Sequence, residues 1–216
     1  MAKHCGLPVG MITAATNAND ITHRCFSEGD FSRSKTMEKT LSDAINIQLP
    51  YNMERLLFYA SGRDHEKIAG WYKGMEETDG ISIPADFLAN LKEEFRSARV
   101  DDDRMCEALR SYHSANGYLC DPHTAVAVGA AFDLGYGEPG SAKACVMATA
   151  SPCKFEESVT IAAGAAVWSE YRSGPDYPKD AGEGGEVAAT FEKAEEGGEE
   201  ETVRLWMERT KELLLE

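Results

Sequence analysis

Residues 6–24, GLPVGMITAATNANDITHR, contain an apolar run that stops at a turn of amide and acid residues. Residues 9–16 are rich in β-branched and small side chains and do not alternate between polar and apolar positions. This pattern is typical of a strand that is covered on both faces, as in a parallel sheet. Ligands of such sheets bind at the carboxyl ends of strands, where this turn lies. Asn17, Asn19 and Asp20 are therefore candidate binding residues, with a polar loop that binds nothing as the alternative, and Asp20 is also a suitable cap for a helix that follows.

Residues 144–150, ACVMATA, predict a second short buried strand. The run ends at a turn of small polar residues, Thr149 to Pro152, and Pro152 predicts the first turn of a helix over residues 153–161. A buried strand, a polar turn and a helix thus occur twice, which indicates an α/β fold. The hydroxyl of Thr149 either binds a ligand at the strand end or caps the helix that follows.

Between these two units the sequence predicts a mostly helical insertion over about residues 45–116. Apolar residues at helical spacing and capping residues predict four helices, over residues 53–61, 66–75, 84–97 and 103–116. Beyond the insertion, His123 lies beside Pro122 at a predicted helix start, where its imidazole would face a pocket. A histidine with purely structural partners is the more common alternative for each histidine of the chain.

Charge and composition exclude several classes of protein. The net charge of −15 argues against a nucleic-acid partner, which would need a basic face. No apolar stretch reaches the roughly 20 residues of a membrane helix, so we expect no membrane partner. The six cysteines are scattered without a CxxC pair, which predicts free thiols in a reducing compartment and no metal site. No nucleophile-elbow, P-loop, dinucleotide-binding or metalloprotease motif occurs in the chain.

The composition also predicts how the chain is organised. Residues 1–170 are expected to form one α/β domain with the helical insertion. Residues 171–201 are rich in Gly and Glu and predict a flexible acidic linker. Residues 202–216 predict an amphipathic terminal helix. The first residues end in a C-cap glycine, Gly6, as the last turn of a longer helix would, and this suggests that the chain is a piece of something longer.

Four segments carry a resemblance to a known family: ATNANDITHRCFSEGDFS, LPYNMERLLF, DPHTAVAVGAA and MATASPCKFEESV. In this order and spacing they resemble the C-terminal part of threonine synthase and its threonine synthase-like relatives. The resemblance implies the fold-type II class of pyridoxal-phosphate enzymes, to which the β subunit of tryptophan synthase belongs. It also implies a lyase that releases phosphate from O-phosphohomoserine, forming threonine, or from a related phosphorylated amino acid.

The resemblance assigns roles to few residues of this chain. Thr149 takes the position whose hydroxyl meets the pyridine nitrogen of the cofactor, while Ser151 stands where microbial threonine synthases commonly have a histidine. The family's Schiff-base lysine and the loop that binds the cofactor phosphate lie upstream in the family, and neither motif occurs here. We therefore expect no catalytic residue within this chain.

Other interpretations stay open at this point. The chain could be a catalytically inactive fragment that binds another protein, and an unrelated flavodoxin-like binding module is a third interpretation. The expected location is the cytoplasm, or a plastid if a transit peptide lies upstream. The sequence leaves the oligomeric state open, a homo-oligomer included, as well as the identity of the phosphorylated amino acid.

Overall fold

The computed structural model describes residues 5–78, 80–178 and Trp206. The chain divides into two units, Met1–Tyr177 and Pro178–Glu216. The predicted acidic linker and terminal helix lie almost entirely outside the described residues, apart from 171–178 and the helical residue Trp206. The predicted domain limits stay predictions, and the following description concerns the first unit.

Two parallel strands lie at the centre of this unit, β1 (Ile12–Thr16) and β2 (Phe95–Arg99). Their register pairs Ile12 with Phe95 and Thr16 with Arg99. Because side chains of a strand alternate between faces, Ala14 joins one hydrophobic core and Ala15 the other. The prediction of a strand covered on both faces is thus confirmed at the centre of β1. Towards its start the strand is more open, and Ile12 is 39% exposed.

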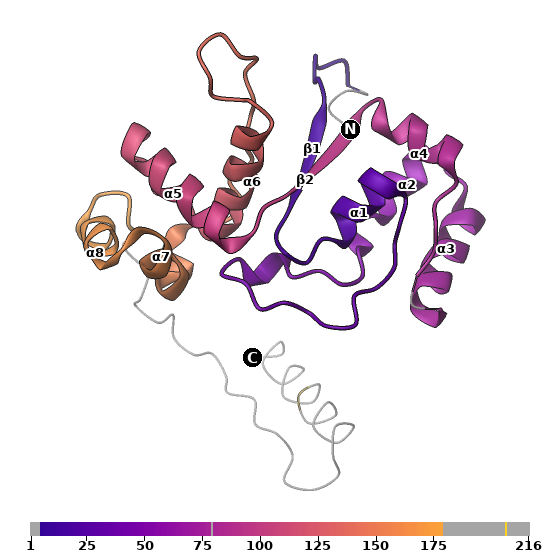
Figure 1. The fold of residues 1–216 in the computed structure, drawn as a ribbon, viewed down its shortest axis with the longest axis horizontal. Helices are drawn as coiled ribbons and strands as arrows, with labels where there is room; N and C mark the ends of the chain where they lie inside the picture. Colours follow the sequence, from indigo (N-terminus) through magenta and orange to yellow (C-terminus); the bar gives the residue numbers. More distant parts are fainter. Residues whose placement is uncertain (1–4, 79, 179–205, 207–216) are drawn as a thin grey trace, which may run out of the picture. The chain divides into compact units, whose positions relative to one another are not determined.

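One group of helices packs with the face of the strands that carries Ala14 (Figure 1). It comprises α1 (Ile21–Glu28), η2 (Tyr51–Met53), α2 (Glu54–Ala60), α3 (His65–Glu77) and α4 (Ala85–Lys92). Their core contains aromatic side chains such as Phe26 and Phe31. The predicted helices over 53–61 and 66–75 are confirmed within two residues at each end.

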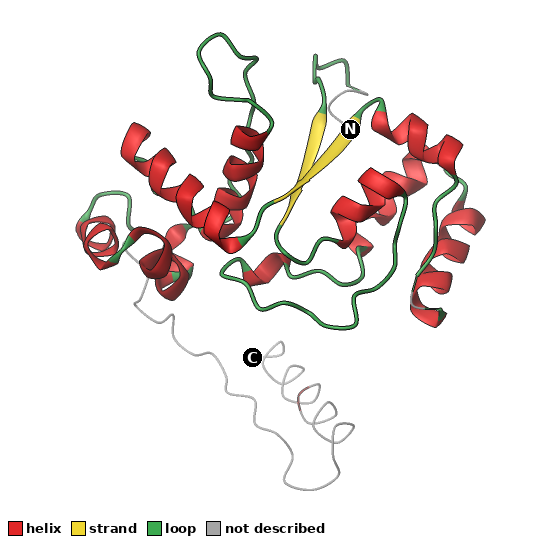
Figure 2. Cartoon of the chain, in the orientation of Figure 1, coloured by secondary structure: helices red, strands yellow, loops and turns green. Residues whose placement is uncertain are grey.

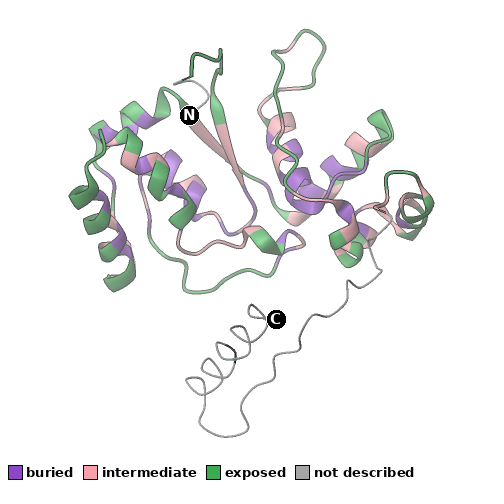
Figure 3. Cartoon of the chain, turned by 180° about the vertical axis from the view of Figure 1, so that it is seen from behind, coloured by how far each residue is buried: buried purple, intermediate pink, exposed green. Residues whose placement is uncertain are grey.

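A second group of helices lies on the other side of the strands (Figure 2). It comprises α5 (Asp102–Asn116), α6 (Pro122–Asp133), η3 (Pro152–Lys154), α7 (Glu156–Ala163) and α8 (Ala165–Ser173). Helix α6 is largely buried (Figure 3). A Cβ at Gly129 of α6 would lie only 3.1 Å from the Val100 side chain, so a small residue permits this close approach.

The predicted helix over 84–97 is wrong in its second half. Helix α4 ends at Lys92, and Phe95–Arg99 forms β2 beside β1. The segment 45–116 therefore contains one of the two strands in addition to the helices α2 to α5, of which α5 comprises Asp102–Asn116. The apolar spacing of Phe87, Leu91 and Phe95 suits a helix, but hydrogen bonds to a strand distant in sequence decide the outcome for Phe95.

The predicted buried strand over 144–150 is also wrong. These residues form an irregular segment that pairs with no strand among the described residues, and most of them are exposed. Met147 is 73% exposed. An apolar segment is buried only where a neighbouring segment covers it, and no such segment among the described residues covers 144–150.

All six cysteines are free thiols, as predicted. Cys25 and Cys120 are buried, whereas Cys5 and Cys145 are exposed. Within the described ranges, no helix is long and apolar enough to cross a membrane.

Candidate functional site

Asn17, directly after β1, is fully buried and is the centre of a hydrogen-bonded amide cluster. Its Nδ2 donates to Thr40 Oγ1 at 2.9 Å, to the Ser42 carbonyl at 3.1 Å and to Asn46 Oδ1 at 2.7 Å. Its Oδ1 accepts the backbone N–H of Asn19 at 2.9 Å. The segment 40–46 is thereby held against the carboxyl end of β1.

The Asn19 side chain extends this cluster. Its Nδ2 donates to the Glu38 carbonyl at 2.9 Å and to Asn46 Oδ1 at 2.7 Å, while its Oδ1 accepts the Glu38 N–H at 2.9 Å. Both amide groups of the predicted turn are thus occupied by protein partners, as buried polar groups require.

A second cluster forms at the start of α6 around Asp121, which is fully buried. Asp121 Oδ1 accepts the backbone N–H of His123 at 2.9 Å and that of Thr124 at 3.3 Å. It therefore caps the helix, and Pro122 suits the first helical position because its missing N–H needs no partner. Asp121 Oδ2 accepts a hydrogen bond from the Thr124 hydroxyl.

His123 connects the two clusters. Its Nδ1 lies 2.9 Å from Asp121 Oδ1, and its Nε2 accepts the N–H of Ala44 at 3.1 Å. Ala44 belongs to the short helix η1 (Asp43–Ile45), within the segment that Asn17 holds. The ring also packs on Phe155 at 4.5 Å between centroids. His123 is therefore buried and fully partnered, so the expectation that its imidazole faces a pocket is wrong.

Thr149 is connected through its backbone to the cluster around Asp121. Its N–H donates to Thr124 Oγ1 at 3.1 Å, and this hydroxyl in turn donates to Asp121. The Thr149 residue itself is exposed, and its hydroxyl has no hydrogen bond within the described ranges. The backbone is thus fixed while the hydroxyl stays available.

We call these connected residues the polar network: Asn17, Asn19, Thr40, Ser42, Asn46, Asp121, His123, Thr124 and Thr149. Four of them, Asn17, Asn19, His123 and Thr149, are candidates from the sequence, and the structure brings them together. The sequence analysis did not find Thr40, Ser42, Asn46, Asp121 and Thr124 as site residues. For Asp121 a signal exists, since Asp before Pro at a helix start marks a cap. The other four have no distinctive local pattern.

The two remaining candidates lie outside the polar network. Asp20 occupies the N-cap position of α1 but makes no capping bond with its side chain. It pairs instead with Arg24 Nε at 3.1 Å and approaches Arg99 Nε at 3.6 Å. Ser151 Oγ lies 3.1 Å from Cys153 Sγ and 3.3 Å from the Tyr171 hydroxyl. Within the described part of the chain, neither side chain forms a hydrogen bond or ion pair with the segment 40–46.

Burial also controls the protonation of groups beside the network. It raises the pKa of the Cys120 thiol to about 12, and the neighbouring Asp121 carboxylate adds to this effect. Burial likewise raises the pKa of Asp102, while two hydrogen bonds from the Leu41 N–H oppose the increase. Cys120 is consequently a protonated, unreactive thiol near neutral pH.

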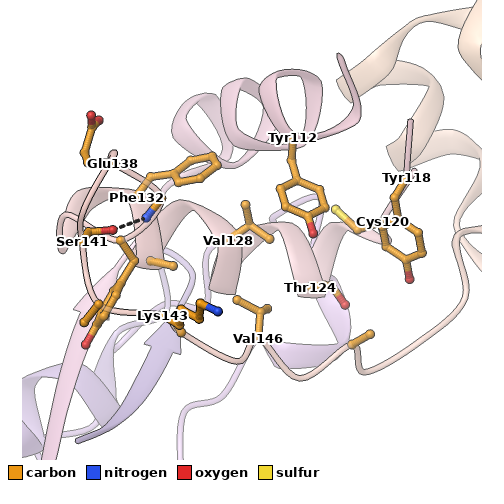
Figure 4. A pocket seen from close by; sticks show the side chains of 16 residues that line it. Tyr112, Tyr118, Cys120, Thr124, Val128, Phe132, Glu138, Ser141, Lys143 and Val146 are labelled. Atoms are coloured by element: carbon orange, nitrogen blue, oxygen red, sulfur yellow. Dashed lines mark hydrogen bonds between the residues drawn. The ribbon is translucent and has the colours of Figure 1, made fainter. Parts of the chain in front are cut away.

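A cavity of about 670 Å³ lies between α5, α6 and the segment 137–148 (Figure 4). Its walls are mainly apolar and aromatic, and Thr124 of the polar network is one of its lining residues. Lys143 is the one lysine among its described lining residues. This lysine belongs to the exposed segment before Thr149.

Comparisons with known proteins identify the class. The chain is 36% identical over 163 residues to threonine synthase-like 2 of Rattus norvegicus, which covers 75% of this chain and 33% of that protein. It is 33% identical over 159 residues to threonine synthase of Pseudomonas aeruginosa, covering 74% and 33%. The solved structure of pyridoxal-phosphate-bound threonine synthase from Brucella melitensis superimposes with a TM-score of 0.67 at 34% identity, covering 76% of this chain and 34% of that one. No family model matches the chain.

These similarities relate the chain to one part of the threonine synthases, and the Brucella melitensis structure among them is pyridoxal-phosphate-bound. The chain is homologous to the matched part of threonine synthase and threonine synthase-like proteins. It spans about a third of the length of the relatives it matches. The resemblance stated from the four sequence segments is thereby confirmed.

The described residues fit one contact with pyridoxal phosphate. The available Thr149 hydroxyl on a fixed backbone can meet a ring nitrogen, because a hydroxyl can donate or accept a hydrogen bond. Asn17, Asn19 and His123 already use their polar atoms within the protein. They are better described as supports of the site than as ligands of the cofactor.

Proposed function

We propose that this chain is the C-terminal part of a threonine synthase-like lyase, which releases phosphate from O-phosphohomoserine or a related phosphorylated amino acid in threonine biosynthesis. The observation that supports this best is Thr149, an exposed residue whose backbone N–H is bonded to the polar network. The cofactor would be pyridoxal phosphate, as in the Brucella melitensis relative.

Pyridoxal phosphate supplies an electron-withdrawing ring that stabilises negative charge beside the substrate's amino group. Thr149 would hold the ring nitrogen by a hydrogen bond. A neutral hydroxyl does not keep a proton on this nitrogen as a carboxylate would, so the residue orients the ring without fixing its charge. The cofactor-bearing lysine and the phosphate-binding loop would come from the part of the enzyme outside the matched third.

A second function, protein binding by a catalytically inactive chain, is favoured by exposed apolar side chains. Leu7 is 58% exposed, Met11 44% and Met147 73%. In the first proposal the same side chains would contact the rest of the enzyme, because large exposed apolar groups mark interfaces. We propose the cytoplasm as the location, or a plastid if a transit peptide lies upstream.

Thr149→Val tests the proposed contact in a protein that joins this chain to the part of the Brucella melitensis enzyme outside the matched region. Valine nearly preserves the shape but removes the hydroxyl. We expect weaker pyridoxal phosphate binding by about 1–3 kcal/mol, the cost of one unmade bond to a buried polar group. The measurement is cofactor affinity by fluorescence titration, with the melting temperature determined in parallel.

Thr149→Ser is the matched control, because it keeps the hydroxyl and should retain affinity close to that of the unsubstituted protein. Unchanged affinity in Thr149→Val, with a clearly lowered melting temperature, would show that Thr149 has only a structural role.

A further inference from the structure

His123 faces two different partners on one short turn. Its Nε2 accepts the Ala44 N–H at 3.1 Å, and Asp43 Oδ1 lies 3.8 Å from the same nitrogen. On the other side of the ring, Nδ1 lies 2.9 Å from Asp121 Oδ1. A backbone N–H can only donate, so Nε2 carries no proton in this arrangement. An ionised carboxylate can only accept, so Nδ1 carries the proton and the ring is neutral.

A second proton would change which partner Nε2 can use. A protonated Nε2 donates and can no longer accept the Ala44 N–H. Asp43 Oδ1, 3.8 Å from Nε2 and one residue before Ala44 on the same turn, can then accept this proton. Two charged groups face the ring, Asp121 at the cap of α6 and Asp43 in η1. Phe155, the residue after η3, contributes only an uncharged ring.

We propose that His123 is a pH-sensitive switch for the segment 40–46. Neutral His123 holds η1 through the Ala44 N–H, and charged His123 releases this N–H and pairs with Asp43. Thr40, Ser42 and Asn46 of the same segment hold Asn17 at the end of β1, so the switch acts on the carboxyl end of the strand. The proposal does not depend on the cofactor or on the proposed function.

The test is an NMR titration of the full chain between about pH 5 and pH 8, close to the range in which histidines titrate. Two quantities are followed: the imidazole shifts of His123, and the hydrogen-exchange protection of the Ala44 amide, corrected for the intrinsic rate. As pH is lowered, we expect the exchange protection of the Ala44 amide to fall about tenfold, the effect of one lost hydrogen bond. This fall should have the same midpoint as the change in the His123 imidazole shifts. Ala44 protection that does not follow this midpoint would overturn the proposal.

Two variants separate the parts of the switch. His123→Gln offers an amide oxygen that accepts the Ala44 N–H at every pH, so protection should no longer depend on pH. Asp43→Asn, a change of a side chain that is 73% exposed, removes the carboxylate with which the charged ring would pair and should reduce the loss of Ala44 protection at low pH.

His23→Gln is the matched control. His23 is partly buried and its Nδ1 lies 3.0 Å from Ser97 Oγ, away from η1. This variant should leave the pH dependence of Ala44 unchanged. Loss of the dependence in His23→Gln, or its persistence in a folded His123→Gln protein, would contradict the assignment to His123.

Discussion

Asp121→Ala should lower the free energy of unfolding by about 3–5 kcal/mol, the largest effect that we expect of a single substitution in the polar network. Asp121 is fully buried and accepts four hydrogen bonds, from the His123 N–H and ring, the Thr124 N–H and the Thr124 hydroxyl. Alanine leaves these donors without a partner inside the protein, and each costs about 1–3 kcal/mol when no relaxation occurs. It also removes the cap of α6, which is worth about 1 kcal/mol.

The measurement is urea unfolding at pH 7, followed by circular dichroism. Asp121→Asn is the matched control, since its amide oxygen still accepts hydrogen bonds from the His123 and Thr124 N–H groups, so it should lose clearly less stability than alanine. A loss below about 1 kcal/mol for Asp121→Ala would show that solvent or other groups replace the carboxylate, contrary to its role as a buried centre of the network.

Asn17→Asp should cause the second large loss in the free energy of unfolding. It preserves the shape of the side chain but replaces a hydrogen-bond donor with an acceptor. The Ser42 carbonyl and Asn46 Oδ1 now receive hydrogen bonds from Asn17 Nδ2, and a carboxylate would repel both. We expect a loss of about 2–4 kcal/mol at pH 7, from an unpaired charge and unmet acceptors in a fully buried position.

This loss should depend on pH in a defined direction. Burial and the facing oxygens raise the pKa of the new carboxyl in the folded state above its value in the unfolded chain. The folded variant therefore binds a proton more tightly, and its deficit relative to the unsubstituted protein shrinks as pH falls through the raised pKa. Unfolding in urea at pH 7 and pH 5 measures this difference. Asn52→Asp, at an exposed position, should change stability by no more than about 0.5 kcal/mol at either pH, and an equal loss in both variants would contradict the account.

The elements that sequence analysis predicted correctly are those specified by neighbouring residues. Residues 12–16, which form β1, are rich in β-branched and small side chains. Asp121 and Pro122 mark the start of α6, because Asp caps a helix and Pro suits its first position. Polar and apolar positions do not alternate in β1, and this pattern correctly predicted that both faces of the strand are covered. Four separated segments were enough to identify the family.

The elements that escaped prediction depend on partners far along the chain. Strand β2 exists because residues 95–99 pair with β1, 83 positions earlier in the case of Arg96 and Thr13. The acceptors that Asn17 Nδ2 bonds come from residues 23–29 positions away, in a segment without regular spacing. The run 144–150 has the composition of a buried strand, but burial also requires a covering neighbour, and composition does not report one.

We propose that this chain supplies one wall of a pyridoxal phosphate site and not the residue that bears the cofactor. Borohydride reduction in the presence of pyridoxal phosphate, followed by mass-spectrometric mapping of the modified lysine, tests it most directly. Two samples are compared, the chain alone and the chain joined to the remaining part of the Brucella melitensis enzyme, with the intact Brucella enzyme as the positive control.

We predict stoichiometric modification of a single lysine in the joined protein, located in the Brucella part. We predict no stoichiometric modification of any one lysine in the chain alone, Lys143 beside the cavity included. Stoichiometric modification of Lys143 or another lysine of this chain would contradict the account. So would a folded joined protein that binds no cofactor while the intact Brucella enzyme does.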